Sequence, residues 1–210
     1  MGELGLDDEV LTRSTRGIEQ TRGWQVSQLY DLACAVYARR EQPLELLVLR
    51  RAQHERMPSS STYRALRAAA ETLDGWPVEQ DAARATLQRA DVRAFVDALL
   101  DDGEAEPAWS AATAARQDAL GSDLWLRLAE SREPDHPADA LFVYQRLADE
   151  QLQRADRRAY RSAAWILKRA QAAAQAAELH DEFAEYLARL REHHRRRPTL
   201  IAILDKARLP

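Results

Sequence analysis

The chain has 210 residues, 30% of them charged, and a formal net charge of −4, which is typical of a soluble globular protein with one domain or two small ones. It contains 39 alanines, 28 leucines and 28 arginines, but only 20 β-branched residues. Because Ala, Leu and Arg lose little on entering a helix, whereas strands favour β-branched and aromatic residues, this composition predicts an all-α fold and excludes sheet-based folds.

Residues 1–22 are polar and aperiodic, and we expect a flexible or loosely docked N-terminus there. Helical periodicity begins at Trp24 and predicts helices over about 24–40, 43–56, 61–73 and 78–89. Asp91 is expected to cap a fifth helix, which ends at the acidic turn 101–106. A sixth helix over about 108–116 and a short seventh at 124–130 complete an acidic N-terminal helical part, residues 23–133.

The helical pattern is clearest in residues 134–210. Pro137 suits the first turn of a helix that extends toward residue 155, and Asp156 is placed to cap the next one. Another helix begins near Asp181, and Pro198 separates it from a closing turn or two. About ten helices with short links are therefore expected to pack as antiparallel hairpins, in a tetratricopeptide-like solenoid or an irregular bundle.

Internal repetition is weak. A shift of 42 residues places Leu141 on Phe183, Tyr144 on Tyr186 and Ala148 on Leu190. Such a period suits two-helix repeats, although helices that share one period also align by chance. The shift favours the solenoid over the irregular bundle.

Charge is unevenly distributed along the chain. Residues 136–210 sum to +4 and residues 1–135 to −8, so a basic C-terminal helical part, residues 134–210, continues from an acidic one. A basic segment of this kind binds polyanions, docks onto acidic protein surfaces, or simply forms solvated helix faces.

One tryptophan lies among cations on the helix that follows Asp156. At 100° per residue, one side of this helix is apolar, and the opposite side carries Arg158, Arg161, Trp165, Lys168 and Arg169. An exposed indole is costly, so either an adjacent helix hairpin covers it or a partner does, such as an acidic peptide or a nucleic-acid strand stacked on the ring. These five residues are the predicted partner-binding site.

A second basic group, Arg195, Arg196 and Arg197, follows His193 and His194. Cations in the last turn of a helix complement the negative end of its dipole, which is one explanation of the run; binding of a polyanion is the other. A metal site at the histidines, or at the acidic turn 101–106, lacks the further donors or the ligand spacing that such sites use.

No catalytic motif is recognisable: the sequence has no glycine-rich phosphate loop, no HExxH and no serine in a G-x-S-x-G setting. Cys34 is the only cysteine, so no disulfide and no multi-cysteine metal centre can form within the chain. We expect no enzyme activity, no cofactor and no metal. The first residues lack an apolar signal-peptide core and no apolar run could cross a bilayer, so a cytoplasmic location with no membrane partner is expected.

The blocks HPADALFVYQRLADEQLQRADRRAYRSAAWILKRA and EFAEYLARLREHHRRRPTLIAIL resemble the helical C-terminal region of bacterial SWIM zinc-finger proteins. The resemblance covers about residues 120–207 and implies helix packing rather than chemistry. It departs from the family at the zinc finger, which needs a C-x-C pair followed by C-x-H, because this chain has Cys34 alone. Zinc binding and recognition by that finger are therefore not implied.

The sequence predicts a non-enzymatic helical module that binds another protein through a groove between helix hairpins, with Trp165 and its flanking cations as the site. The alternative is an accessory protein that binds nucleic acid through its basic C-terminal third. The sequence leaves the oligomeric state open.

Overall fold

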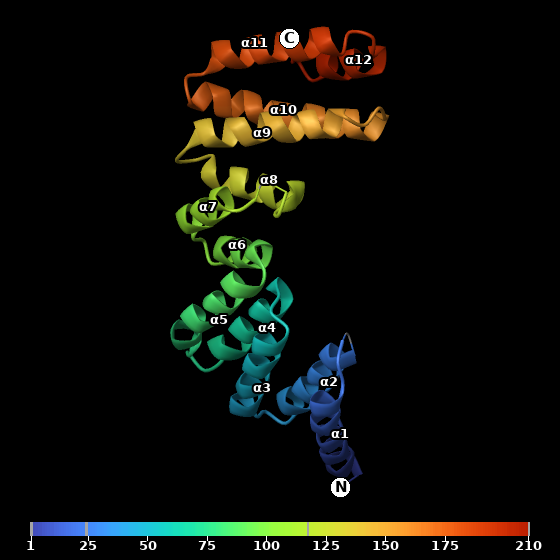
Figure 1. Cartoon of the computed structure of the whole chain (residues 1–210), viewed down its shortest axis with the longest axis vertical. Coiled ribbons are helices and arrows are strands. Elements are labelled where there is room, and N and C mark those ends of the chain that lie inside the picture. Colours follow the sequence, from blue (N-terminus) through green and yellow to red (C-terminus); the bar gives the residue numbers. More distant parts are fainter. Residues whose placement is uncertain (1, 24, 117, 210) are drawn as a thin grey trace. The chain divides into compact units, whose positions relative to one another are not determined.

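The computed structural model describes residues 2–23, 25–116 and 118–209, and within them the chain forms twelve helices and no strand (Figure 1). The all-α prediction is confirmed. Contacts between helices are mostly between neighbours in the sequence, as expected for stacked hairpins. None of the described helices is long and apolar enough to cross a membrane.

The chain divides into two compact units, Met1–Ala98 and Leu99–Pro210. The first contains α1 (Gly2–Gln20), α2 (Gln25–Arg39), α3 (Pro43–Arg56), α4 (Ser60–Glu71) and α5 (Trp76–Ala90). The boundary falls inside α6 (Val92–Asp101). The second unit continues with α7 (Ala105–Ala114), α8 (Gly121–Arg132), α9 (Pro137–Leu152), α10 (Arg157–Ala176), α11 (His180–His193) and α12 (Pro198–Lys206). The compositional division at residue 134 lies between α8 and α9.

Several helices begin at the residues that the sequence predicts. Ser59 accepts a hydrogen bond from the backbone N–H of Thr62 and forms a full capping box at the start of α4. The Asp91 carboxylate accepts from two N–H groups at the start of α6, and that of Asp156 does the same for α10. Pro43 and Pro137 occupy first-turn positions, where a missing N–H costs nothing. Trp24, the first residue of the predicted helix over 24–40, lies outside the described residues.

Helix ends reveal how a chain with only seven glycines reverses direction so often. Glu41, Asp74 and Glu178 follow α2, α4 and α10 with φ between 52° and 59°, in the left-handed region. In each case the next residue donates its N–H to a carbonyl five residues back, for example Gly75 to Ala70 at 2.9 Å. This is the Schellman pattern that usually takes glycine at the left-handed position.

The helix α1 was missed by the sequence analysis, which assigned no helix before Trp24. Among the residues of α1 whose burial is described, Asp7, Ser14 and Ile18 are buried, so two of these three side chains are polar. Asp7 hydrogen-bonds Arg39 and Arg40 of α2. The Arg39 hydrogen bond, against the effect of burial, holds the pKa of Asp7 below its usual value.

The first unit packs around aromatic residues. The Tyr63 ring is fully buried and meets the Trp76 ring edge-on, with 5.2 Å between centroids. Beside it, the buried His54 lies 3.0 Å from both Thr62 Oγ1 and the Ala83 carbonyl. Because a carbonyl only accepts, Nε2 of His54 carries the proton, and burial lowers the pKa of this ring.

The second unit is built around the α9–α10 hairpin, whose helices run side by side (Figure 1). Small residues make this close approach possible. Eight buried positions of the two helices are alanines, namely Ala140, Ala148, Ala159, Ala163, Ala164, Ala170, Ala173 and Ala174. Toward α7 and α8, guanidinium groups cover indoles: Arg132 lies 5.0 Å from the Trp109 ring and Arg146 lies 4.4 Å from the Trp125 ring. Alanine seams and stacked arginines thus hold these helices together.

Candidate functional site

The helix α10 has two clearly different sides. Its buried side is a stripe of alanines with Tyr160, Ile166 and Leu167. On its opposite side Arg158, Arg161 and Lys168 are exposed, and Trp165 exposes 50% of its surface. These four residues are exposed on the side of α10 where the sequence places them, and we call Arg158, Arg161, Trp165 and Lys168 the Trp165 face.

The Trp165 ring is not fully covered by the described residues of its own chain. The guanidinium carbon of Arg169 lies 5.6 Å from the centre of the ring, and the rest of the face is solvated. Packing against an adjacent hairpin therefore does not cover the whole residue, which keeps 50% of its surface exposed. An exposed remainder of this size is what a partner could bury.

Arg169 differs from the other predicted partner-binding residues, because it is bonded within the unit. It donates to Glu130 at 2.6 Å and to Glu133 at 2.8 Å, and it lies 5.4 Å from the Tyr144 ring. Burial would raise the pKa of Glu133, but hydrogen bonds from Tyr144 and Arg169 outweigh it and lower that pKa. Arg169 thus joins α8, α9 and α10 and supports the Trp165 ring.

The three arginines of the predicted polyanion-binding run have different environments. Arg195 pairs with Glu192 one turn earlier. Arg197 donates to the backbone carbonyl of Leu152 at 2.7 Å, which ties the α11–α12 turn to the end of α9. Only Arg196 is exposed without a hydrogen bond or ion pair to a described residue.

Arg196 and Arg197 contribute to a pocket that sequence reasoning did not find. This basic pocket has a volume of about 990 Å³ and is lined by Ala155, Arg157, Tyr160, Arg196, Arg197, Pro198, Thr199, Ala202, Ile203 and Lys206. Four of these residues are cations and none is acidic. The charge of Arg157 and Lys206 was visible in the sequence, but their meeting depends on α12 packing against α10.

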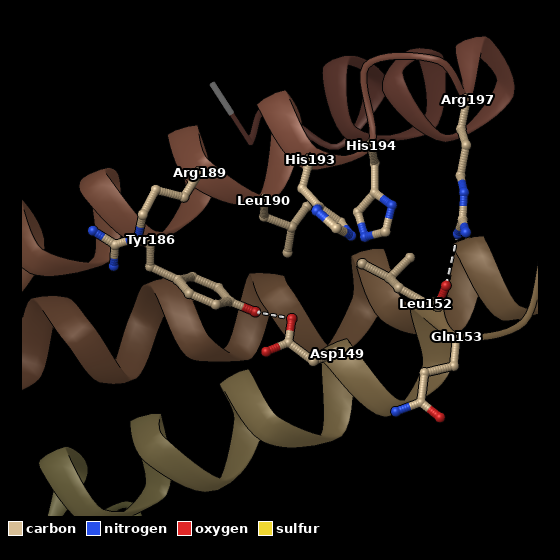
Figure 2. A pocket seen from close by; sticks show the side chains of 9 residues that line it. All are labelled: Asp149, Leu152, Gln153, Tyr186, Arg189, Leu190, His193, His194 and Arg197. Atoms are coloured by element: carbon tan, nitrogen blue, oxygen red, sulfur yellow. Dashed lines mark hydrogen bonds between the residues drawn. The ribbon is translucent and has the colours of Figure 1, made fainter.

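A second pocket, of about 440 Å³, lies between the end of α9 and α11 (Figure 2). Tyr186 donates its hydroxyl to Asp149 at 2.9 Å across this groove. The His193 and His194 rings meet edge-to-face with 4.7 Å between their centroids. The pKa of His194 is lowered, mainly by burial and to a smaller extent by the positive charge of Arg197. Trp165 lines neither pocket, so the groove between hairpins and the exposed indole are separate features.

These surfaces carry exposed cations and an exposed aromatic ring. In the part of the chain that the structure describes, no group of three or more His, Cys, Asp or Glu side chains is placed to hold a metal ion. Cys34 is buried in α2, and burial raises the pKa of its thiol to about 11, so it is a poor nucleophile at neutral pH. Exposed cations, an exposed indole and a basic pocket offer binding to anions and apolar groups.

Comparison with protein-family models, with curated proteins and with solved structures finds no match to this chain.

Proposed function

We propose that this chain is a non-enzymatic helical module that binds another protein through the Trp165 face. The observation that carries the proposal is the 50% exposure of Trp165 among Arg158, Arg161 and Lys168. Tryptophan and arginine dominate the energetics of protein interfaces, because an indole buries a large apolar area and arginine makes directional hydrogen bonds.

The charges on this face support the same proposal. The guanidinium groups of Arg158 and Arg161 have no hydrogen bond or ion pair to any described residue, and the Lys168 ammonium donates only to the uncharged Gln171 at 2.8 Å. Arg169, held by Glu130 and Glu133, fixes one side of the indole. The face therefore presents an aromatic ring, contacted on one side by Arg169, next to cations that have no acidic partner. An acidic segment of a binding partner would supply the missing charge.

A relationship to the helical C-terminal region of bacterial SWIM zinc-finger proteins is part of this proposal, as is a tetratricopeptide-like stacking of the hairpins. Both fit the packing of consecutive helices. Neither the relationship nor the stacking identifies a partner or an activity. A cytoplasmic location is also part of the proposal.

The test is capture of a partner by the immobilised chain from cells that produce it, followed by affinity measurement with matched variants. Trp165→Ala should weaken binding at least about tenfold, and Arg161→Glu should weaken it comparably. Phe142→Ala is the control, because Phe142 is also an exposed aromatic residue, 67% exposed, but lies on α9. If Trp165→Ala and Arg161→Glu bind as the wild type does while remaining folded, the proposed face is wrong.

Nucleic acid is the second candidate partner, and the basic pocket is the observation that favours it. Phosphate contacts made by Arg157, Arg196 and Lys206 would make binding fall steeply with salt, with a slope set by the number of phosphates contacted. Single- and double-stranded oligonucleotides tested by gel retardation at low salt decide this. Absence of retardation for both removes the candidate.

A further inference from the structure

The basic pocket brings Arg157 together with cations at both ends of α12, which lies about forty residues further along the sequence. Arg157 is the first residue of α10, Arg196 and Arg197 precede α12, and Lys206 is the last residue of α12. Like charges repel, so a cluster without an acidic lining residue costs stability unless an anion joins it. The arrangement is therefore that of a site for an anion.

The acidic residues next to these cations in the sequence are engaged elsewhere. The Asp156 carboxylate accepts from the N–H groups of Arg158 and Ala159, at 2.9 Å each. Asp205 accepts from Arg191 at 2.6 Å. Neither is among the residues that line the pocket, and Arg157 and Lys206 make no hydrogen bond or ion pair to a described residue.

The walls of the pocket strengthen the field of its cations. Pro198, Ala202 and Ile203 provide apolar surface beside the charges, and low-dielectric walls focus the potential of a charged cleft. The bond from Arg197 to the Leu152 carbonyl holds one guanidinium at the pocket before any ligand arrives. A preorganised cation loses less freedom on binding than a mobile one.

A phosphate monoester fits this site better than the backbone of a nucleic acid. A monoester carries a charge of about −1.5 to −2 at pH 7 and three strong acceptor oxygens, so several converging guanidinium and ammonium groups can bind one group. A nucleic acid spreads single charges along its length and would meet the field of the whole chain, whose net charge is −4.

The pocket also lies one helical turn from the Trp165 face along α10. Arg157 lines the pocket, and Arg161 lies one turn further along α10, on the same side of the helix. A peptide segment whose phosphate occupies the pocket can therefore extend along α10 toward Trp165. We propose, building on the protein-binding function above, that the basic pocket binds a phosphate monoester on a phosphorylated serine or threonine of the protein partner.

The first test titrates the chain with inorganic phosphate at pH 7.5, against chloride at equal ionic strength, and follows backbone amide shifts by NMR. The largest shifts are expected in residues 157–160 and 196–203. The variant with Arg157→Ala, Arg196→Ala and Lys206→Ala should weaken phosphate binding at least about tenfold. Arg158→Ala removes a neighbouring exposed arginine outside the pocket and should change it less than about twofold. If the triple variant and the wild type bind inorganic phosphate with the same affinity, the proposal is overturned.

The second test asks whether the phosphate belongs to the partner. Phosphatase treatment of the captured protein should weaken its binding to the wild-type chain at least about tenfold and leave its weaker binding to the triple variant unchanged. If binding is lost in the Trp165→Ala variant but is insensitive to phosphatase, the phosphate proposal fails while the protein-binding function stands. If phosphate titrates into the pocket but the Trp165→Ala variant binds the partner normally, the protein-binding face fails instead.

The third test separates a nucleic-acid source. Oligonucleotides with and without a 5′-phosphate are titrated against the wild-type chain and the triple variant. We expect little binding of either oligonucleotide, whereas binding of the protein partner is sensitive to phosphatase. Tight binding of both strands that is lost in the triple variant would assign the pocket to the nucleic-acid backbone and overturn the proposal.

Discussion

Paired and unpaired arginines are distributed differently in the two units. In the first unit arginines bridge helices: Arg50 pairs with Asp31 at 2.8 Å, Arg51 with Glu79 at 2.6 Å and Arg64 with Asp97 at 2.7 Å. In the second unit the side chains of seven exposed cations lack any hydrogen bond or ion pair to a described residue: Arg154, Arg157, Arg158, Arg161, Arg196, Lys206 and Arg208.

This difference separates cations that hold the fold from cations left available for binding. The Arg51 guanidinium donates a hydrogen bond to each carboxylate oxygen of Glu79, and these hydrogen bonds lower the pKa of Glu79. Pairing of this kind also occurs in the second unit, where Arg132 and Arg169 bind acids between helices. Exposed cations whose side chains have no bonded partner among the described residues also occur in the first unit, at Arg16 and Arg22; in the second unit they lie on or next to α10 and α12, where both proposed binding surfaces lie.

The largest expected effect comes from removing a paired arginine of the second unit. Arg132 is buried, packs on the Trp109 ring and bonds both Glu106 and Asp139. Because its partners are partly solvated, Arg132→Ala should lower the free energy of unfolding by about 2–3 kcal/mol rather than the larger cost of a fully buried pair. Urea denaturation measures it. A loss below about 0.5 kcal/mol, the ordinary range for surface substitutions, would contradict the structural role assigned to Arg132.

A smaller effect is expected from His54, the buried histidine of the first unit. Burial lowers its pKa in the folded protein below the ordinary value of 6.5. As pH falls through 6.5 the unfolded chain gains a proton that the folded protein does not, so stability is complete above that value and decreases below it. Urea midpoints at pH 7.5 and pH 5.5 should differ in the wild type and differ less in His54→Gln.

The control for this pH profile is His180→Gln, which replaces an exposed histidine of the second unit. It should keep the wild-type dependence on pH. An unchanged pH dependence in His54→Gln would show that other groups govern the acid side of the profile.

The smallest effect on stability is expected from the unpaired cations. Arg161→Ala and Arg157→Ala remove exposed charges with no bonded partner among the described residues, so each should change the free energy of unfolding by less than about 0.5 kcal/mol. Relief of like-charge repulsion could make the second change slightly stabilising. The measurement is the same urea titration. If either substitution lowers the free energy of unfolding by more than about 1 kcal/mol, the unpaired arginines contribute to stability as the paired ones do.

Much of the local structure follows from short-range chemistry. Asp156 and Ser59 cap helices because their side-chain oxygens reach N–H groups two or three residues ahead. The Trp165 face follows from helical geometry alone. The helix over 105–114 starts before its predicted position at 108 because Pro107 fits within a first turn and does not have to precede the helix.

Features that depend on distant residues could not be predicted in the same way. The α1 helix packs through Asp7, Ser14 and Ile18, a pattern that is recognisable only once Arg39 and Arg40 are known to face it. The basic pocket joins Arg157 to Lys206, and nothing within either segment predicts that meeting.

The sequence by itself determined the helical class, most helix starts and the side of α10 on which Trp165 lies, because propensity, capping and the 3.6-residue period act over a few residues. Only the tertiary structure decided which cations have partners. Arg169 is bonded to acids 36 and 39 residues away, whereas Arg161, on the same helix, has no bonded partner among the described residues. Charge is a property of the residue, but its pairing depends on which helices pack together.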